Sequence, residues 1–386
     1  MKKLFASAIL LSLSFTAFAD TADHYTIIVD AGSTGSRLHL FQYNTNASVP
    51  VINDIFSEST KPGLSSFAND PQDSGASLKT LFDDAVNTMQ AKNIDPKTVQ
   101  VNVLATAGMR LLTDAQQKAI YANVTNYIQN TYPQFTIGHI ETIPGKMEGV
   151  YAWLDVNYLF GALNYNQFNK SSAGIIDMGG ASTQIAFATT PDKAWKDDEI
   201  SMTINGQPYT VFSKSFLKLG QDQARNTMNG NAKAWSCYPL AYFYNDNDIG
   251  DYNFDNCHQV YDDIITQRQV VQQVPAIAKG QQFVAFSGVY YAYNFFKVDA
   301  TPDQASVESS IRQVCNTGWD QMKKDYPNVP EKYLSSYCAN ATYIDDLLYG
   351  TYQLSGNQIT VLNQIHDTDI DWPLGALLYS LISPAK

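Results

Sequence analysis

The stretch VDAGSTGSR, residues 29–37, ends an apolar run with an aspartate, Asp30, and continues as a loop of small residues. The β-branched residues before Asp30 predict a strand, and RLHLFQY, residues 37–43, predicts a second strand by its alternating apolar and polar side chains. Glycines let backbone N–H groups surround an anion, and serine and threonine hydroxyls add donors. For a single loop of this kind, however, an ordinary hairpin turn is the better explanation.

The pattern recurs in AGIIDMGGASTQIAFA, residues 173–188, where Asp177 takes the place of Asp30. Asp177 lies 147 residues after Asp30. A duplicated unit of that size predicts an α/β protein with two related lobes, each opening with a β-hairpin whose turn faces the other lobe. The cleft between the lobes is then the expected ligand site, and the second copy favours phosphate binding over a coincidental turn.

The predicted division of the chain follows from these two copies. We place lobe I at residues 20–151 and lobe II at residues 152–373, with a C-terminal helix at residues 374–386 that returns to lobe I. From about residue 190 onward the chain is rich in Tyr, Asn, Gln and Asp, which predicts a lobe with long loops.

Residues 1–19 have the features of a secretory signal peptide. Lys2 and Lys3 precede an apolar stretch, residues 4–18, and small residues stand at its end. An uncleaved membrane anchor is the alternative, but the stretch is short for a membrane span. The sequence therefore predicts an exported protein, secreted or periplasmic, without a membrane anchor, and the short Lys-Lys start is typical of a bacterial leader.

The formal net charge of −12 restricts the partners that the chain can have. An acidic surface argues against nucleic acid, because nucleic-acid binding depends on basic side chains that neutralise phosphates. The same surface would repel a free nucleotide unless a divalent cation screens its phosphates. A monomer is the default expectation.

All four cysteines lie in the C-terminal half of the chain. Because their number is even and an exported protein meets an oxidising compartment, two disulfides are expected. Pairing of sequence neighbours is favoured, although three connectivities remain possible. The residues concerned are Cys237 with Cys257 and Cys315 with Cys338.

Asp30 and Asp177 would repel a phosphate held in their loops. Their positions make sense only if a cation lies between the aspartates and the phosphate. Mg²⁺ and Ca²⁺ take oxygen ligands, and Mg²⁺ keeps several waters. Two aspartates that face each other across a cleft could therefore hold a hydrated cation through its water shell. The alternative is that each aspartate only caps its own turn.

Two further residues are candidates for the chemistry. Glu148, in IPGKMEGVYAWLDVNYLFG, residues 143–161, falls in the first turn of a predicted helix, where the helix dipole favours an ionised base. Thr106, in LATAGMRLL, residues 104–112, follows a predicted buried strand and could point its hydroxyl into the cleft. The alternative for Glu148 is that it only compensates the helix dipole. The alternative for Thr106 is that it only forms part of a turn at the end of the strand.

Five stretches together resemble a known family. VDAGSTGSR, LATAGMR, GKMEGVYAW, GIIDMGGASTQIAF and DWPLGALL resemble, in this order, the five conserved regions of the nucleoside triphosphate diphosphohydrolases, or apyrases. They run from residue 29 to residue 378, and the first is most similar to the plant, fungal and protozoan branch. The resemblance implies an actin-like fold of two ribonuclease-H-like lobes with a duplicated mixed sheet. It also implies cation-dependent removal of terminal phosphates from nucleoside tri- and diphosphates.

The resemblance also implies roles for individual residues. Glu148 corresponds to the general base for the attacking water, Ser182 and Gln184 to the residues that position this water, and Thr106 to a neighbour of the scissile group. The residues implied to surround the phosphates are Ser33, Thr34, Gly35, Ser36, Arg37, Gly179, Gly180 and Ala181.

Asp30 and Asp177 correspond to the residues that hold Mg²⁺ or Ca²⁺ through water. The third region of the family usually carries two adjacent acids, and here Met147 replaces the first of them. The segments that would contact the nucleobase match the family less closely. Tyrosine rings could stack on a base, although core packing is the default for most of them. The candidates are Tyr291, Asn340 and Tyr343.

Three other functions fit the sequence less well than nucleotide hydrolysis. A kinase needs cytosolic ATP, which export argues against, and an exopolyphosphatase would favour a basic channel, which the acidic charge does not suggest. A nucleotide-binding switch or adhesin has no need of the water-positioning set of Glu148, Ser182 and Gln184. The sequence leaves open the preferred base, the preferred cation and the ratio of triphosphate to diphosphate hydrolysis.

Overall fold

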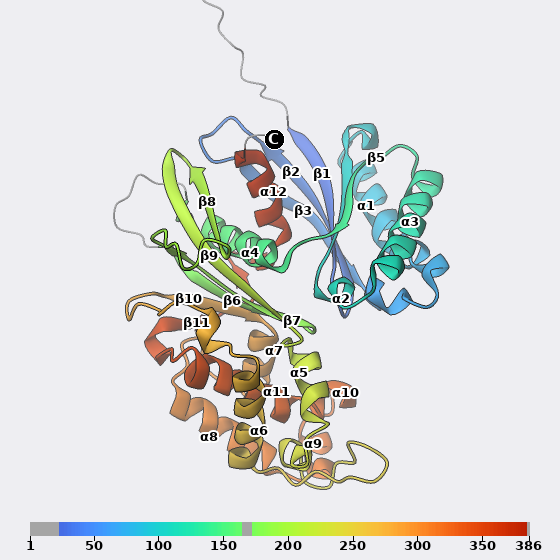
Figure 1. Ribbon diagram of the computed structural model, residues 1–386. Helices are drawn as coiled ribbons and strands as arrows, with labels where there is room; N and C mark the ends of the chain where they lie inside the picture. Colours follow the sequence, from blue (N-terminus) through green and yellow to red (C-terminus); the bar gives the residue numbers. More distant parts are fainter. Residues whose placement is uncertain (1–22, 164–171, 384–386) are drawn as a thin grey trace, which may run out of the picture.

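The computed structural model describes residues 23–163 and 172–383. The chain forms two β-sheets with helices around them, and Figure 1 shows one sheet in the upper part of the molecule and the other near its middle. The predicted leader, residues 1–19, lies outside the described residues, as do the last three residues of the predicted C-terminal helix.

The first sheet has the strand order β3-β2-β1-β4-β5 and is built around the first hairpin. Strand β1 pairs antiparallel with β2 and parallel with β4, and Asp30 near its end lies opposite Arg37. The strands are β1 (His24–Ala31), β2 (Ser36–Asn44), β3 (Val51–Thr60), β4 (Gln100–Ala105) and β5 (Thr136–Thr142).

The second sheet has the order β11-β10-β6-β7-β9-β8 and repeats this arrangement. Strand β6 pairs antiparallel with β7, its hairpin partner, and parallel with β10, so β6 and β7 correspond to β1 and β2. The duplicated mixed sheet predicted from the two aspartate-containing loops is thereby confirmed. The strands are β6 (Gly174–Met178), β7 (Ser182–Thr189), β8 (Glu199–Ile204), β9 (Gln207–Leu217), β10 (Phe283–Ser287) and β11 (Ile359–Val361).

Helices cover both faces of the first sheet. On one face, Phe82 of α1 and Val124 of α3 share a core with Val29 of β1. On the other side, α4 and α12 lie between the two sheets (Figure 1), where α4 packs against β6, β7 and β9 and α12 packs against α4, β1 and β3. The bounds are α1 (Lys79–Ala91), α3 (Asp114–Thr131), α4 (Gly145–Leu159) and α12 (Pro373–Ile382).

A helical layer covers the face of the second sheet that points away from the first (Figure 1). Its core includes the buried rings of Tyr261, Tyr293 and Tyr343. The helices are α5 (Gln221–Met228), α6 (Phe254–Gln267), α7 (Gly288–Phe295), α8 (Gln304–Cys315), α9 (Trp319–Asp325), α10 (Glu331–Leu334) and α11 (Tyr337–Asp345), followed by a π-helical turn (Asp346–Thr351). Short elements elsewhere are α2 (Ala107–Arg110), β12 (Gln364–Ile365) and β13 (Thr368–Asp369).

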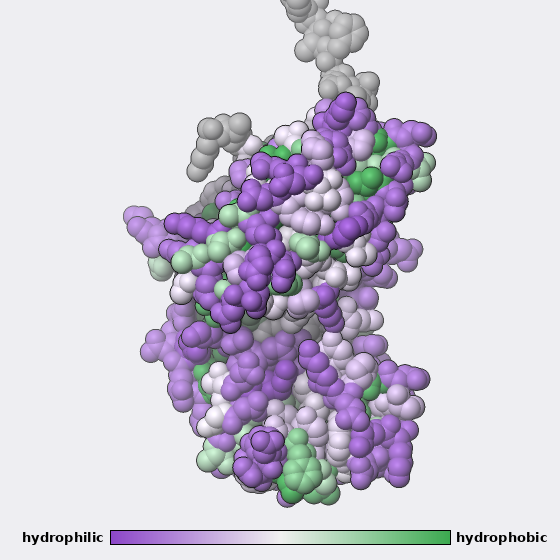
Figure 2. Space-filling view, turned by 90° about the vertical axis from the view of Figure 1, so that its right-hand side faces the viewer, coloured by the Kyte–Doolittle hydropathy of each residue, from purple (hydrophilic) through white to green (hydrophobic). Residues whose placement is uncertain are grey.

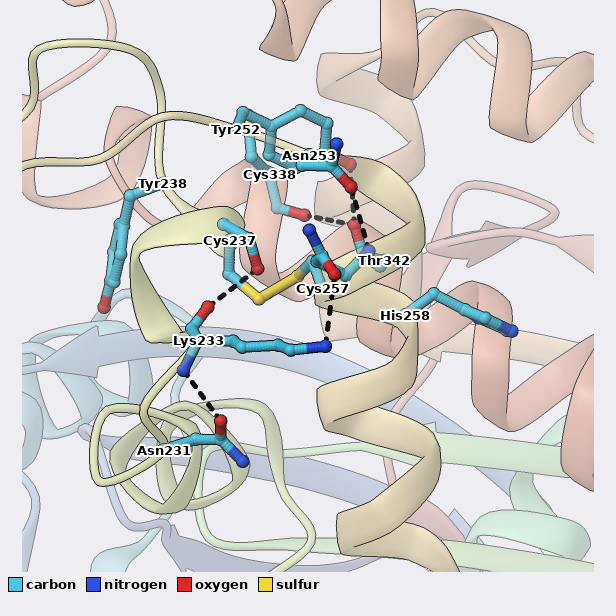
Figure 3. The surroundings of a disulfide bond; sticks show 12 residues. Asn231, Lys233, Cys237, Tyr238, Tyr252, Asn253, Cys257, His258, Cys338 and Thr342 are labelled. Carbon is cyan, nitrogen blue, oxygen red and sulfur yellow. Dashed lines mark hydrogen bonds between the residues drawn. A yellow bond between two sulfur atoms is a disulfide. The ribbon is translucent and has the colours of Figure 1, made fainter.

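Two disulfides brace the helical layer, and they confirm the pairing of sequence neighbours. Cys237 is bonded to Cys257, and Cys315 is bonded to Cys338. Figure 3 shows the first bond, which ties the short turn that begins near Lys233 to helix α6. Each bond joins two segments that also pack against each other in the core of this layer.

Polar side chains dominate the face of the molecule that Figure 2 shows, over both halves of the structure. Within residues 23–163 and 172–383, no helix combines the length and the apolar character that crossing a membrane would require.

Candidate active site

The turns that follow β1 and β6 meet between the two sheets. A Cβ atom added at Gly180, in the second turn, would lie 2.9 Å from Ser33 Oγ and 3.0 Å from Thr34 Cγ2 in the first turn. A larger residue at position 180 would therefore push the turns apart. The first turn is also approached closely from α2, because a Cβ atom at Gly108 would lie 2.7 Å from Ser33 Cα. Small residues thus allow the two turns to share one site.

The predicted phosphate-binding residues lie in these turns and at the start of β2. Ser36 is buried, and its hydroxyl has no hydrogen-bond partner within the described residues. Arg37 donates to Asp369, with Nη1 3.3 Å from Oδ2. The guanidinium is therefore held at the edge of the first turn by a carboxylate from the C-terminal segment. The turn residues are Ser33, Thr34 and Gly35 in the first turn and Gly179, Gly180 and Ala181 in the second.

Asp30 and Asp177 lie near the ends of the equivalent strands β1 and β6, where Asp177 is buried and Asp30 is partly buried. Each has an oxygen with no hydrogen-bond partner within the described residues. Burial raises the pKa of Asp177 to about 6, although a hydrogen bond with Ser287 acts in the opposite direction. Burial also raises the pKa of Asp30 well above its usual value, and the carboxylates of Glu148 and Asp177 raise it further. The acidic groups of the two lobes are thus close enough to repel one another.

This pair of aspartates fits a divalent cation. Buried carboxylates that lack donors and repel each other are costly as ions, and a cation between them removes that cost. Within the described part of the chain, no three His, Cys, Asp or Glu side chains gather closely enough to ligate a metal directly. Carboxylate oxygens are nevertheless the groups with which hydrated Mg²⁺ and Ca²⁺ interact.

Glu148 lies in the first turn of α4, as predicted. It is also buried and forms an ion pair with Arg110. Burial raises the pKa of Glu148 to about 7, while Arg110 lowers it and Asp177 raises it. The Arg110 guanidinium, at the end of α2, donates a hydrogen bond to the Glu148 carboxylate on α4. The sequence indicated only the helix dipole as an influence on Glu148, so the stronger effects of burial and of Arg110 are findings of the structure.

A hydrogen-bonded chain leads from Glu148 to the water-positioning residues. Arg110 Nη1 donates to Ser215 Oγ at 3.2 Å, and Gln184 Nε2 donates to the same oxygen at 3.0 Å and to Ser182 Oγ at 2.8 Å. Gln184 lies opposite Asp177 in the β6–β7 pair, so the two side chains share a face of the sheet. Gln184 Oε1 is buried and lacks a donor within the described residues. The structure thus brings the predicted base and the predicted water-positioning residues together.

Thr106 is buried at the end of β4, and its N–H donates to the carbonyl of Ala31 at 3.2 Å. This contact places Thr106 beside the end of the first hairpin strand. Three polar residues near the site were not singled out from the sequence: Arg110, Ser215 and Ser287. Ser287 hydrogen-bonds Asp177 and has a φ angle of 54°, a strained conformation for a residue other than glycine. Arg110 stood within a quoted motif, whereas no local pattern marks the two serines.

The three candidates for base contact lie in different environments. The ring of Tyr291 is 57% exposed and available to a ligand. The Asn340 amide is buried and bonded to Arg225 at 2.8 Å and to Gln221 at 3.1 Å. Tyr343 is fully buried, and its hydroxyl donates to a backbone carbonyl. Of the three, therefore, only Tyr291 presents a free ring face, and the positions of the other two correspond to structural roles in the helical layer.

Comparison with known proteins places this site in a family. The sequence profile of the GDA1/CD39 (nucleoside phosphatase) family matches residues 16–384. The chain is 26% identical to probable apyrase 3 of Arabidopsis thaliana, over 93% of this chain and 83% of that protein. It is 27% identical to ectonucleoside triphosphate diphosphohydrolase 1 of Mus musculus, over 92% of this chain and 80% of that protein.

A solved structure supports the fold independently. The crystal structure of nucleoside triphosphate hydrolases from Neospora caninum matches with a TM-score of 0.70 over 94% of this chain and 93% of that chain, at 14% sequence identity. At this identity the likeness establishes the two-lobed fold and not the activity. The match of the family profile over nearly the whole chain goes further: the chain belongs to the GDA1/CD39 family of nucleoside phosphatases and is a hydrolase of the nucleoside triphosphate diphosphohydrolase class.

Proposed function

We propose that the chain is a secreted apyrase that removes terminal phosphates from nucleoside tri- and diphosphates with a divalent cation. The observation that carries this proposal is the gathering of Asp30, Asp177 and Glu148 where the two turns meet. Asp30 and Asp177 would interact with a hydrated cation, and Glu148 would act as the general base. The two disulfides support export, because such bonds persist in oxidising compartments.

The turns would bind the phosphates of the substrate. Backbone N–H groups and hydroxyls of residues 33–36 and 179–181 are the donors that a phosphate chain requires, and the glycines let it approach the backbone. Mg²⁺ or Ca²⁺, when bound, neutralises phosphate charge and separates the phosphates from the two aspartates. By holding the substrate between the lobes, the turns fix the terminal phosphorus relative to Glu148, and positioning of this kind supplies much of the rate.

Glu148 would accept a proton from the attacking water. As the water oxygen bonds to the terminal phosphorus, the bond from that phosphorus to the bridging oxygen breaks on the opposite side, and the shortened nucleotide leaves. Gln184 Oε1, which has no hydrogen-bond partner within the described residues, and the hydroxyl of Ser182 would orient the water. Arg110 holds the Glu148 carboxylate in position and offsets part of the effect of burial on its pKa.

The pKa of Glu148 predicts how activity depends on pH. Only the ionised carboxylate accepts a proton, and burial raises its pKa to about 7, so kcat/KM should rise with pH through about 7 and level off above it. The measurement is kcat/KM for ATP from about pH 5 to about pH 9 at constant ionic strength. A profile without a rise on the acidic side would contradict this role of Glu148.

Phosphate release tests the proposed function directly. ATP and ADP should each release phosphate in the presence of Mg²⁺ or Ca²⁺, release should stop with excess chelator, and added cation should restore it. Heat-denatured protein serves as the control. No release from either nucleotide, despite binding, would indicate a switch, and release from inorganic polyphosphate alone would indicate an exopolyphosphatase.

A further inference from the structure

Asp371 is an acidic residue near the active site that takes no part in the phosphate binding and proton transfer described above. It stands immediately before Trp372, between β13 and α12, and its side chain is 18% exposed. Its Oδ2 lies 3.1 Å from Nε2 of His39 and 3.9 Å from Nη1 of Arg37. Two positively charged groups on strand β2 therefore hold this carboxylate.

The register of the first sheet places these partners beside the cation site. Arg37 lies opposite Asp30, and His39 lies opposite Ile28. Directly opposed residues share a face of a sheet, and so do residues two apart on one strand. Arg37, His39 and Asp30 therefore project from the same face, the face on which α12 packs. Asp371, at the start of α12, is fixed over that face close to Asp30.

His39 is a buried cation that joins two carboxylates. Its Nδ1 lies 2.7 Å from Asp54 Oδ2, and its side chain is 2% exposed. Burial lowers the pKa of His39, but Asp371 and Asp54 more than offset this effect and raise the pKa to about 10. The contact with Asp54 is a hydrogen bond, and the 3.1 Å contact with Asp371 is an ion pair. Asp371 is thus held by the charge of His39.

The backbone of Asp371 is fixed from a second side. Its N–H donates to Asp155 Oδ2 at 2.9 Å, and Asp155 is fully buried in α4, the helix that also carries Glu148. In addition, the charge of Asp371 raises the pKa of both Asp30 and Asp177, which belong to different sheets. The carboxylate therefore lies where it acts on both aspartates of the cation site.

The charges in this cluster do not balance without a further cation. His39 and Arg37 supply two positive charges, and the carboxyl groups that they face or adjoin are Asp30, Asp54, Asp155, Asp369 and Asp371. Asp30, Asp54 and Asp155 each have a buried oxygen with no hydrogen-bond partner within the described residues, and so does Asp177. Buried charge that is neither paired nor hydrogen-bonded is costly, so the cluster favours a divalent ion.

We infer that Asp371 is a third carboxylate of the cation's outer shell, positioned by His39 and Arg37. This inference rests on the proposed function, because it concerns the same cation. The Asp371 carboxylate would accept hydrogen bonds from waters of the ion, as would the carboxylates of Asp30 on β1 and Asp177 on β6. Its role is to strengthen cation binding and not to take part in proton transfer.

Direct cation binding tests the inference without reliance on activity. Mn²⁺ is the probe, because it shares the oxygen ligands of Mg²⁺ and its free concentration can be read by electron paramagnetic resonance. Asp371→Asn, which removes the charge at nearly constant size, should weaken Mn²⁺ binding to the nucleotide-free protein roughly tenfold. Asp369→Asn is the matched control: it also removes a partner of Arg37, but its side chain is 46% exposed and should leave the affinity unchanged.

The possible outcomes separate this inference from the proposed function. Unchanged Mn²⁺ affinity in Asp371→Asn, with normal binding by the unaltered protein, would overturn the inference alone, as would an equal loss in Asp369→Asn. Absence of Mn²⁺ binding by the unaltered protein would overturn both. Thermal unfolding of each variant checks that the fold is retained, and Asp371→Ser provides a second neutral variant. Asp371→Glu keeps the charge and should recover part of the lost affinity, which a purely structural role would not require.

Discussion

Replacing Glu148 by glutamine is expected to lower kcat for ATP hydrolysis by about 10²- to 10⁴-fold, because the attacking water loses its proton acceptor. Glutamine is nearly the same size and can still accept the hydrogen bond from Arg110, so the buried site need not rearrange. Nucleotide affinity should change little, because Glu148 belongs to α4 and to neither of the turns that would hold phosphate.

Single-turnover phosphate release and equilibrium binding of a nucleotide analogue are the two measurements for this variant. Glu141→Gln is the matched control, because Glu141 lies on β5 with a side chain that is 58% exposed. Turnover of Glu148→Gln close to that of the unaltered protein would refute the role of Glu148 as base. Loss of binding together with turnover would instead indicate that Glu148 supports the structure of the site.

Replacing Asp177 by asparagine is expected to reduce activity and to stabilise the cation-free protein. Partners in the outer shell of a metal typically contribute 10- to 100-fold, so the cation concentration for half-maximal activity should rise by about that factor. Without a cation, the ionised Asp177 is buried and short of donors, and this costs stability. Asparagine removes the charge of Asp177. It therefore removes a group that interacts with the cation, and it also removes the destabilisation that the buried charge causes.

The pKa of Asp177 sets the pH at which this stabilisation appears. Burial raises the pKa to about 6 from an ordinary value of 3.8, so the folded state favours the protonated form. The stability of the unaltered protein should therefore fall as pH rises between these two values, and the asparagine variant should not share that loss. The difference in Tm between them is then absent near pH 3.8 and fully developed above about pH 6.

Thermal unfolding in excess chelator across this pH range measures the effect. Asp320→Asn is the control, because the Asp320 side chain is 88% exposed and its loss should not change Tm with this pH dependence. Lower activity together with a lower Tm of Asp177→Asn at neutral pH would contradict this prediction. Such a result would show that Asp177 stabilises the fold and is not held in place for a cation.

Features confined to one short stretch of chain could be predicted from the sequence. Each hairpin is specified locally, because small residues form its turn and its flanking residues have the pattern of a strand. The repetition of Asp30 and its turn at Asp177 was enough to predict two related sheets, which the strand pairing confirms. The disulfides followed from the proximity of the cysteines in the sequence.

Contacts between distant segments could not be predicted in this way. The pair of Arg110 and Glu148 spans 38 residues, the bond from Arg110 to Ser215 spans 105, and the bond from Arg37 to Asp369 spans 332. Likewise, the sequence around Tyr343 suggested contact with a nucleobase but did not reveal that this tyrosine is fully buried. A local pattern describes the neighbours of a residue in its own element and carries no information on which remote segment will cover it.

The sequence by itself therefore determined the two hairpins, the family and the identity of the acids around the cleft. Only the tertiary structure decided what state these acids are in: that Glu148 is paired with Arg110, that burial brings its pKa to about 7, and that Asp371 raises the pKa of Asp30 and Asp177. The physical reason is that a pKa depends on loss of solvent and on every nearby charge. Both arise when segments far apart in the chain pack together, so neither is contained in any one stretch of it.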